Sequence, residues 1–208
     1  MVLGSSSMQI VRFSALLMTL CAVSVQAADR QWQLAREEDG IRVYLADVPG
    51  SQYKAYRGVV TVKSDMPGLL AVQEDIAGSC AWIYSCQQQR LLKSEGEVSE
   101  LYTRFEMPWP VKARDSIIEV TTHTESDGSV TRQLKAVPER LPEEGGFVRV
   151  QRVDGQWRLK PLQGGRVEVT YEAHTEPGGS VPSWLANSFV VDAPLQTLKG
   201  LRAQVEGG

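Results

Sequence analysis

The feature that most constrains this sequence is a long run of strand-like segments followed by one long helical segment. From Gln88 to Thr175 the chain is rich in β-branched and aromatic residues, interrupted by short turn signals that contain glycine. Strands joined by such short connections are antiparallel neighbours. From Pro182 to Val205 the apolar residues change to helical spacing, over about 36 Å at about 1.5 Å per residue. The order predicts an α+β fold in which a curved antiparallel sheet surrounds a long C-terminal helix.

Hydrophobic periodicity and turn residues predict the individual elements. Residues 32–38 are expected to form a short helix or turn, and a further helix is expected over residues 68–75. The expected strands are 41–45, 53–62, 88–94, 98–107, 116–124, 130–136, 147–151, 156–161 and 167–175. Asp154-Gly155 is interpreted as a turn between two of them. Pro194 removes a backbone hydrogen bond from the closing helix and predicts a hinge near Asp192.

Residues 1–27 have the features of an export signal preceded by a few extra residues. A short basic stretch leads into an apolar segment, residues 13–25, and small residues follow up to Ala27. The apolar segment is shorter than the roughly 18 to 20 residues that cross a bilayer as a helix. We therefore expect cleavage near Ala27, a periplasmic mature protein, and a single domain over residues 28–208.

The charge balance argues against a nucleic-acid-binding protein. The chain has 22 Lys and Arg against 25 Asp and Glu, and the expected cleavage removes one basic residue, Arg12. No excess of basic side chains is left to neutralise a phosphate backbone. We expect a monomer without a nucleic-acid partner.

Two cysteines remain after the expected cleavage, Cys80 and Cys86. Export would place them in a compartment that permits disulfides, so a bond between them is predicted. Six residues turn an α-helix by about 600°, which puts the two side chains on different faces. The bond therefore requires a helix to end or bend at this point. Two buried free thiols are the alternative.

Three further stretches of sequence follow one another in a specific order. They are Trp109-Pro-Val-Lys-Ala-Arg114-Asp115-Ser-Ile-Ile, then Gly146-Phe-Val-Arg149 with Trp157-Arg-Leu-Lys-Pro161-Leu, then Val167-Glu-Val-Thr-Tyr171 with Pro177-Gly-Gly-Ser-Val-Pro182-Ser-Trp184-Leu. In this order they resemble the START family of lipid-transfer domains, named from the steroidogenic acute regulatory protein. The resemblance implies a helix-grip fold, a hydrophobic tunnel for a single lipid, and a lid that includes the closing helix.

The resemblance also bears on the ligand class. In steroid-binding members an acid and a base face each other inside the cavity, and Phe105 and Val120 stand at those positions here. This departure argues against a sterol and favours acyl chains. A phospholipid is the ligand we expect, exchanged during transient contact with membranes.

Strand alternation selects the side chains expected to line the tunnel. If Phe105 and Val120 point inward, so does Ile118, and Tyr171 shares the inward face of the last strand. The inner wall is then apolar except for threonines and the hydroxyl of Tyr171. A solid core without a cavity would produce the same pattern.

The closing helix and the loops supply the other candidate ligand-binding residues. On the helix they are Trp184, Leu185, Ser188, Val191 and Leu195. Trp109, held between two prolines, is expected at the rim of the tunnel. Arg114 and Arg149 are candidates for a headgroup phosphate, which matches the fixed fork of a guanidinium; the alternative is that each anchors a strand to a loop.

Patterns for catalysis are weak in this sequence. His123 and His174 lie at the polar phase of their strands, where we expect exposure, and neither has metal-ligand spacing or a neighbouring nucleophile motif. We expect no metal, no cofactor and no enzyme activity. Two other classes stay open: a helix-grip enzyme of the cyclase or aromatase kind, and an interaction module with a filled core.

Overall fold

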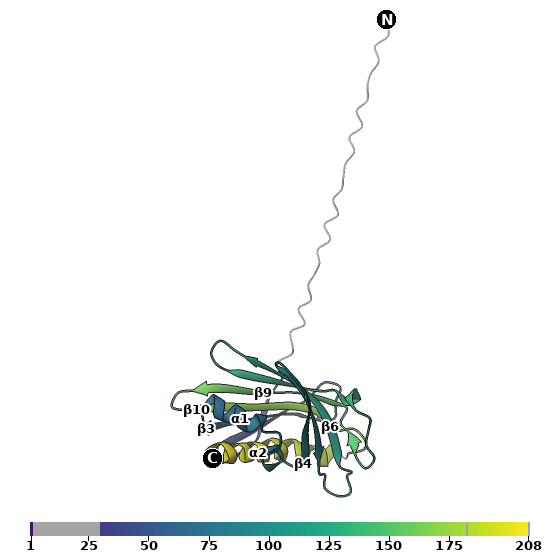
Figure 1. Ribbon diagram of the computed structural model, residues 1–208. Coiled ribbons are helices and arrows are strands. Elements are labelled where there is room, and N and C mark those ends of the chain that lie inside the picture. The colour runs from purple at the N-terminus through teal and green to yellow at the C-terminus, as the bar shows by residue number, and fades with distance from the viewer. Residues whose placement is uncertain (2–29, 182, 208) are drawn as a thin grey trace.

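A curved antiparallel sheet gripping one long helix dominates the computed structural model, which describes Met1 and residues 30–181 and 183–207 (Figure 1). The strands are β1 (Gln33–Glu38), β2 (Ile41–Ala46), β3 (Ala55–Lys63), β4 (Cys86–Glu95), β5 (Val98–Phe105), β6 (Arg114–Thr124), β7 (Val130–Ala136), β8 (Val148–Arg149), β9 (Arg152–Leu162) and β10 (Arg166–Glu176). The helices are α1 (Met66–Glu74), α2 (Ser183–Gly207) and two short 3₁₀ turns, Ser79–Ala81 and Pro138–Arg140. The predicted export signal lies outside the described residues.

The strand order is β1-β2-β3-β10-β9-β7-β6-β5-β4, with every neighbouring pair antiparallel. The short β8 lies off this path and pairs parallel with the start of β6. Pairing of β10 with β3 brings the last strand next to one of the first, and α2, which follows β10, packs on β2 and β3 (Figure 1). In the part of the chain that is described, no helix is long and apolar enough to cross a membrane.

The solid core lies under the C-terminal half of α2. Three leucines of this half are fully buried against valines and an isoleucine of β2, β3 and β10. The leucines are Leu195, Leu198 and Leu201. Gly58 in β3 allows the close approach, because a Cβ there would lie 2.6 Å from Leu198 Cδ1. α2 contains the buried Pro194 and is one helix from Ser183 to Gly207, so the expected hinge is not a break in the helix.

One Asp-Gly pair forms a turn and another lies inside a strand, and both differ from what the sequence predicted. Asp39 and Gly40, with φ of 52° and 74°, form a hairpin turn that pairs β1 with β2, so residues 33–38 are a strand and not a helix or turn. Gly155, by contrast, lies inside β9 beside Ala173 of β10. A Cβ at Gly155 would lie 2.5 Å from the carbonyl oxygen of Glu172, so glycine permits close strand approach there.

Cys80 and Cys86 are joined by a disulfide, as the sequence predicted. Cys80 lies in the 3₁₀ turn Ser79–Ala81, and Cys86 begins β4. The helical conformation thus ends between the two cysteines, which the bond requires. The bridge closes the segment that leads from α1 into the sheet, and residues of this segment face the cavity described next.

Candidate functional site

A cavity of about 320 Å³ lies between the sheet and α2. Side chains at every second position of three strands form much of its wall. They are Leu101, Thr103 and Phe105 of β5, Ile118 and Val120 of β6, and Tyr171, Ala173 and Thr175 of β10. The cavity shows that these inward faces do not meet in a solid core. Its volume lies near the lower end of the usual range for ligand pockets.

The roof of the cavity is a face of α2 made largely of small residues. It is formed by Ala186, Phe189, Val190, Ala193 and Thr197. Because each residue turns an α-helix by about 100°, this set lies on a different face from the buried leucines that pack on the sheet. α2 therefore has two apolar faces, one against the solid core and one above the cavity.

The helix positions expected to line the tunnel need correction. Leu185 and Val191 are half-buried but lie outside the cavity wall, and Ser188 is exposed. Leu195 is fully buried in the solid core. The side chain of Trp184 lies outside the described residues. Large apolar residues on a helix mark where it packs tightly, whereas a helix face above a cavity carries smaller ones.

The remaining candidates divide between the cavity and its surroundings. Phe105, Ile118, Val120, Tyr171 and Arg114 line the cavity. Trp109 is outside the wall and 92% exposed, on the loop that follows β5. Glu106 and Met107, just before it, do line the cavity, which places the loop at the mouth.

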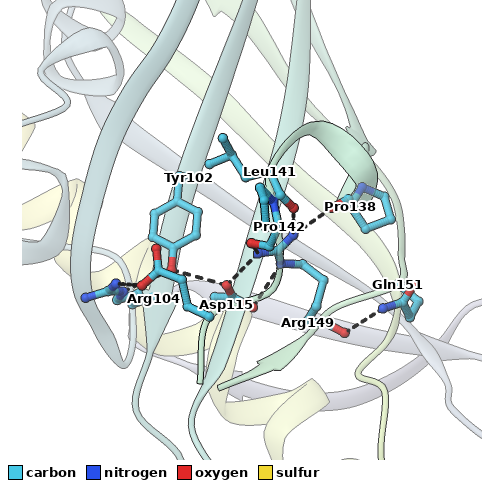
Figure 2. A network of polar contacts seen from close by, with 9 residues as sticks. Tyr102, Arg104, Asp115, Pro138, Leu141, Pro142, Arg149 and Gln151 are labelled. Atoms are coloured by element: carbon cyan, nitrogen blue, oxygen red, sulfur yellow. Dashed lines mark hydrogen bonds and ion pairs between the residues drawn. The ribbon is translucent and has the colours of Figure 1, made fainter. Parts of the chain in front are cut away.

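Arg149 lies in a buried network of polar contacts (Figure 2) and is not among the residues that line the cavity. Its Nε and Nη2 donate to the two carboxylate oxygens of Asp115 at 3.0 and 2.9 Å. Three further bonds go to the carbonyl oxygens of Pro138, Leu141 and Pro142, so all five donors of the guanidinium are used. The Asp115 carboxylate raises the pKa of Arg149. Arg149 therefore anchors β6 to the loop after β7 and has no donor left for a ligand.

Arg114 anchors a strand to a loop, which is one of the two roles that the sequence left open, and it also faces the cavity. Its guanidinium donates to the carbonyl oxygens of Lys112 and Gly178, which ties the start of β6 to the loop before α2. It also lines the cavity, and its Nε has no hydrogen-bond partner within the described residues. Burial lowers the pKa of Arg114.

The other end of the cavity contains polar side chains that the sequence analysis missed. Arg132 of β7 and Gln73 of α1 are both buried and line the cavity, and Arg132 Nη1 donates to Gln73 Oε1 at 3.1 Å. The inner wall therefore carries more polar side chains than the threonines and Tyr171 that we expected. The available signal was the alternation Val130, Arg132, Leu134, which puts an arginine on the inward face of β7.

Stacked aromatic rings also line the cavity, starting beside Arg132. The rings of Trp157 and Tyr171 are parallel with centroids 3.9 Å apart, and Tyr56 meets Tyr171 edge-on at 5.2 Å. Burial raises the pKa of both tyrosine hydroxyls, so they stay protonated and neutral. These residues form a rigid, mostly apolar surface with two neutral hydroxyl groups.

The two histidines lie away from the cavity wall, with one correction. His123 is exposed, as expected. His174 lies between the lining residues Ala173 and Thr175, hence on the opposite face of β10, but it is fully buried there. Its Nε2 is 3.1 Å from Glu176 Oε1, which also accepts a bond from Ser51 in the β2–β3 connection. Among the described residues, no group of three His, Cys, Asp or Glu side chains is placed to hold a metal ion.

Comparison with known proteins gives consistent likenesses. The family model for the START domain matches residues 15–206. An uncharacterized protein of Pseudomonas aeruginosa is 52% identical over 197 residues, which cover 95% of this chain and 98% of that protein. The phosphatidylcholine transfer protein of Bos taurus is 27% identical over 165 residues, 75% of each chain.

Solved structures share the fold. The crystal structure of a STAR-related lipid transfer protein from Xanthomonas axonopodis has a TM-score of 0.79 at 39% identity, covering 84% of this chain and 98% of that one. Human StAR-related lipid transfer protein 5 has a TM-score of 0.76 at 18% identity, covering 85% and 86%. The predicted helix-grip fold, with its curved sheet and closing helix, is confirmed.

Proposed function

The chain belongs to the START domain family, and from that membership we propose that it is an exported carrier that holds one phospholipid and transfers it between membranes. The observation that carries the proposal is the cavity between the sheet and α2, lined mainly by apolar and aromatic side chains. Each methylene group removed from water is worth about 0.8 kcal/mol, so a bare acyl chain crosses water very slowly. A cavity with such a wall makes the exchange between membrane and protein nearly balanced.

A phospholipid is favoured over a sterol by two observations. Phe105 and Val120 line the cavity where the steroid-binding pattern places an acid and a base. Buried arginines, Arg114 and Arg132, face the cavity, and a guanidinium matches the geometry of a phosphate. The likeness to a phosphatidylcholine transfer protein supports the same ligand class.

Contact with a membrane is proposed at the mouth of the cavity. Trp109 is almost fully exposed there, between Pro108 and Pro110. Tryptophan favours the interface between water and the acyl region of a bilayer, because its ring is apolar while its N–H still donates. Insertion of Trp109 would bring the cavity mouth against the lipid it exchanges.

A carrier without enzyme activity is what we propose. Neither histidine is among the residues that line the cavity. Of the described lining residues, the one with a carboxylate is Glu106, which is exposed and accepts a bond from Gln87 Nε2 at 2.7 Å. A general acid or base would be expected in a more buried position.

Native mass spectrometry of protein purified from a periplasmic extract tests the proposal most directly. We expect one bound phospholipid per chain, released and identified after extraction. The purified protein should also move a fluorescent phosphatidylcholine from donor to acceptor vesicles. A protein that carries no lipid and leaves the vesicle exchange rate at its spontaneous value would overturn the proposed function.

A further inference from the structure

A cluster of three polar side chains occupies the end of the cavity next to α1. Arg132 lies beside Trp157 in the β7–β9 pairing, and the rings of Trp157 and Trp82 meet edge-on at 6.1 Å. Gln73 reaches the cluster from α1 through its bond with Arg132. Gln73, Trp82, Arg132 and Trp157 all line the same cavity.

Each of three side chains in the cluster has a buried donor without a partner. Arg132, Gln73 and Trp82 are 8%, 7% and 7% exposed. Arg132 Nε, Gln73 Nε2 and Trp82 Nε1 make no hydrogen bond with any described residue. Arginine has donors only, so Gln73 must turn its oxygen toward Arg132, which leaves its amide nitrogen free. The three unpaired atoms are all donors that belong to residues lining one cavity, so each of them needs an acceptor.

Among the described residues, the positive charge of Arg132 has no carboxylate in direct contact with it. No described carboxylate oxygen lies within 4.0 Å of its guanidinium, in contrast to Arg149 with Asp115. Glu74, the residue after Gln73, is exposed, makes no ion pair with Arg132, and raises the pKa of Arg132 only through a longer-range Coulomb interaction. Burial lowers the pKa of Arg132, yet a guanidinium stays charged at neutral pH. A buried, unpaired charge costs folding free energy, so its position needs a compensating partner.

We propose that Arg132, Gln73 and Trp82 form an anion site that binds the acidic group, a phosphate or a carboxylate, of a lipid held in the cavity. The inference rests on the proposed lipid-binding function and adds the charge and the orientation of the ligand. Arg132 pairs with Thr122, eight residues along β6 from Arg114, a separation of about 26 Å at about 3.3 Å per residue. The acyl chain would therefore extend from the α1 end toward Arg114, past Ile118 and Val120.

Matched pairs of lipids with one chain and different charge test this assignment. Delipidated protein is titrated with oleate and oleyl alcohol, and with lysophosphatidic acid and monoolein, and affinities are measured by calorimetry. We expect each acid to bind about tenfold or more tightly than its neutral partner, the size of a charge-assisted hydrogen bond in a buried site. The acid with the larger advantage shows which group, carboxylate or phosphate, the site prefers.

Arg132→Met removes the charge and keeps an apolar side chain of similar length. We expect the variant to lose the preference for the acids and to bind the neutral lipids as before. Arg158→Met is the matched control, since Arg158 lies next to Trp157 in β9 but is exposed and outside the cavity. Replacing a buried unpaired charge by an apolar residue is often neutral or stabilising, so folding is expected to survive. Arg132→Met combined with Gln73→Leu removes both polar partners if the single variant is unstable.

The outcomes separate this inference from the proposed function. Equal binding of acids and neutral lipids by the unmodified protein, or an equal loss of both in Arg132→Met, overturns the anion site while lipid binding stands. Failure of all four lipids to bind overturns the proposed function. Competition of oleate by millimolar inorganic phosphate, abolished in Arg132→Met, would place the anion chemistry at Arg132 independently of the acyl chain.

Discussion

Three buried arginines near the cavity differ in how their donors are used. Arg149 uses all five of its N–H donors in hydrogen bonds. Arg114 donates two hydrogen bonds to backbone carbonyl oxygens, and Arg132 donates one to Gln73. A saturated arginine holds strands and loops together, whereas an unsaturated one facing a cavity has donors available for a ligand. The number of unused donors, more than burial, separates the two roles.

Arg149→Met should destabilise the protein strongly, because it leaves the Asp115 carboxylate buried without its partner (Figure 2). Loss of one member of a buried ion pair typically costs about 3 to 5 kcal/mol. Urea unfolding at neutral pH measures the change. Arg152→Met is the control, since Arg152 pairs with Asp154 at the surface and should change the stability by less than about 1 kcal/mol. Similar losses in both variants would contradict a structural role special to Arg149.

At the scale of elements, α2 combines two functions on adjacent faces. Leu195, Leu198 and Leu201 fasten its C-terminal half to the sheet, while the face with Ala186 and Ala193 covers the cavity. The division explains why the helix can be firmly attached and still leave space beneath it. Filling that space should affect binding without removing the attachment.

Ala193→Trp should reduce lipid binding by about tenfold or more, because the indole would occupy space that the acyl chain needs. Gln196→Trp introduces the same ring at an exposed position of α2 and should leave binding unchanged. Both affinities are measured by displacement of a fluorescent fatty acid. Unfolding curves of both variants show whether the fold is intact. Retained binding in a folded Ala193→Trp protein would mean that the lipid lies elsewhere.

α2 is also tied to the edge of the sheet by charge. Lys199 contacts both Glu38 of β1 and Asp39 of the following turn, and its hydrogen bond lowers the pKa of Glu38 below the ordinary value of 4.5. A carboxylate with a depressed folded-state pKa stabilises the fold above its unfolded pKa and loses this effect as pH falls through the folded value. The pair should therefore contribute at neutral pH and not in acid.

Glu38→Gln is expected to lower the Tm at pH 7 by a small amount, since the pair is partly exposed. The difference from the unmodified protein should shrink as the pH falls below 4.5 and disappear once the carboxylate is protonated in the folded protein, measured by thermal unfolding at each pH. Glu37→Gln, at an exposed position next in the strand, controls for the change in net charge. A difference that persists unchanged into acid would show that the lost charge is not the cause.

At the scale of the whole molecule, Trp109 is where we expect the carrier to meet a bilayer. Trp109→Ala should slow phosphatidylcholine transfer between vesicles severalfold, because the apolar ring no longer enters the interface. Binding of a soluble short-chain lipid should be unchanged, since Trp109 does not line the cavity. Equal transfer rates with and without Trp109 would assign membrane contact to another surface.

Export and the disulfide can be checked on the same purified protein. If residues 1–27 are a cleaved signal, intact mass will correspond to a chain that begins near Ala28.

Cys80 and Cys86 should give no free thiol on the denatured, unreduced protein, and two after reduction. Reduction should also lower the free energy of unfolding, because the unfolded chain gains conformational entropy when the bond is broken. The effect is limited because the bond closes a short loop. Two free thiols before reduction would contradict the bond.

Apart from β1, the sequence by itself determined the order of the main elements and the alternation of side chains along the strands. Alternation is a local property, so once the resemblance placed Phe105 and Val120 inside the cavity, Ile118 followed on the same face without knowing what lies opposite. Likewise, a run of strands with short connections followed by one amphipathic segment left few arrangements other than a sheet around a helix.

Only the tertiary structure decided which groups meet. Gln73 is 59 residues from Arg132, and Asp115 is 34 residues from Arg149, so the same residue type becomes a candidate anion site in one place and a structural anchor in another. Asp154-Gly155 has the composition of a turn but lies within β9, because β10 approaches too closely for a side chain. Hydrogen-bond partners, burial and empty space depend on atoms from distant segments, and no local pattern contains them.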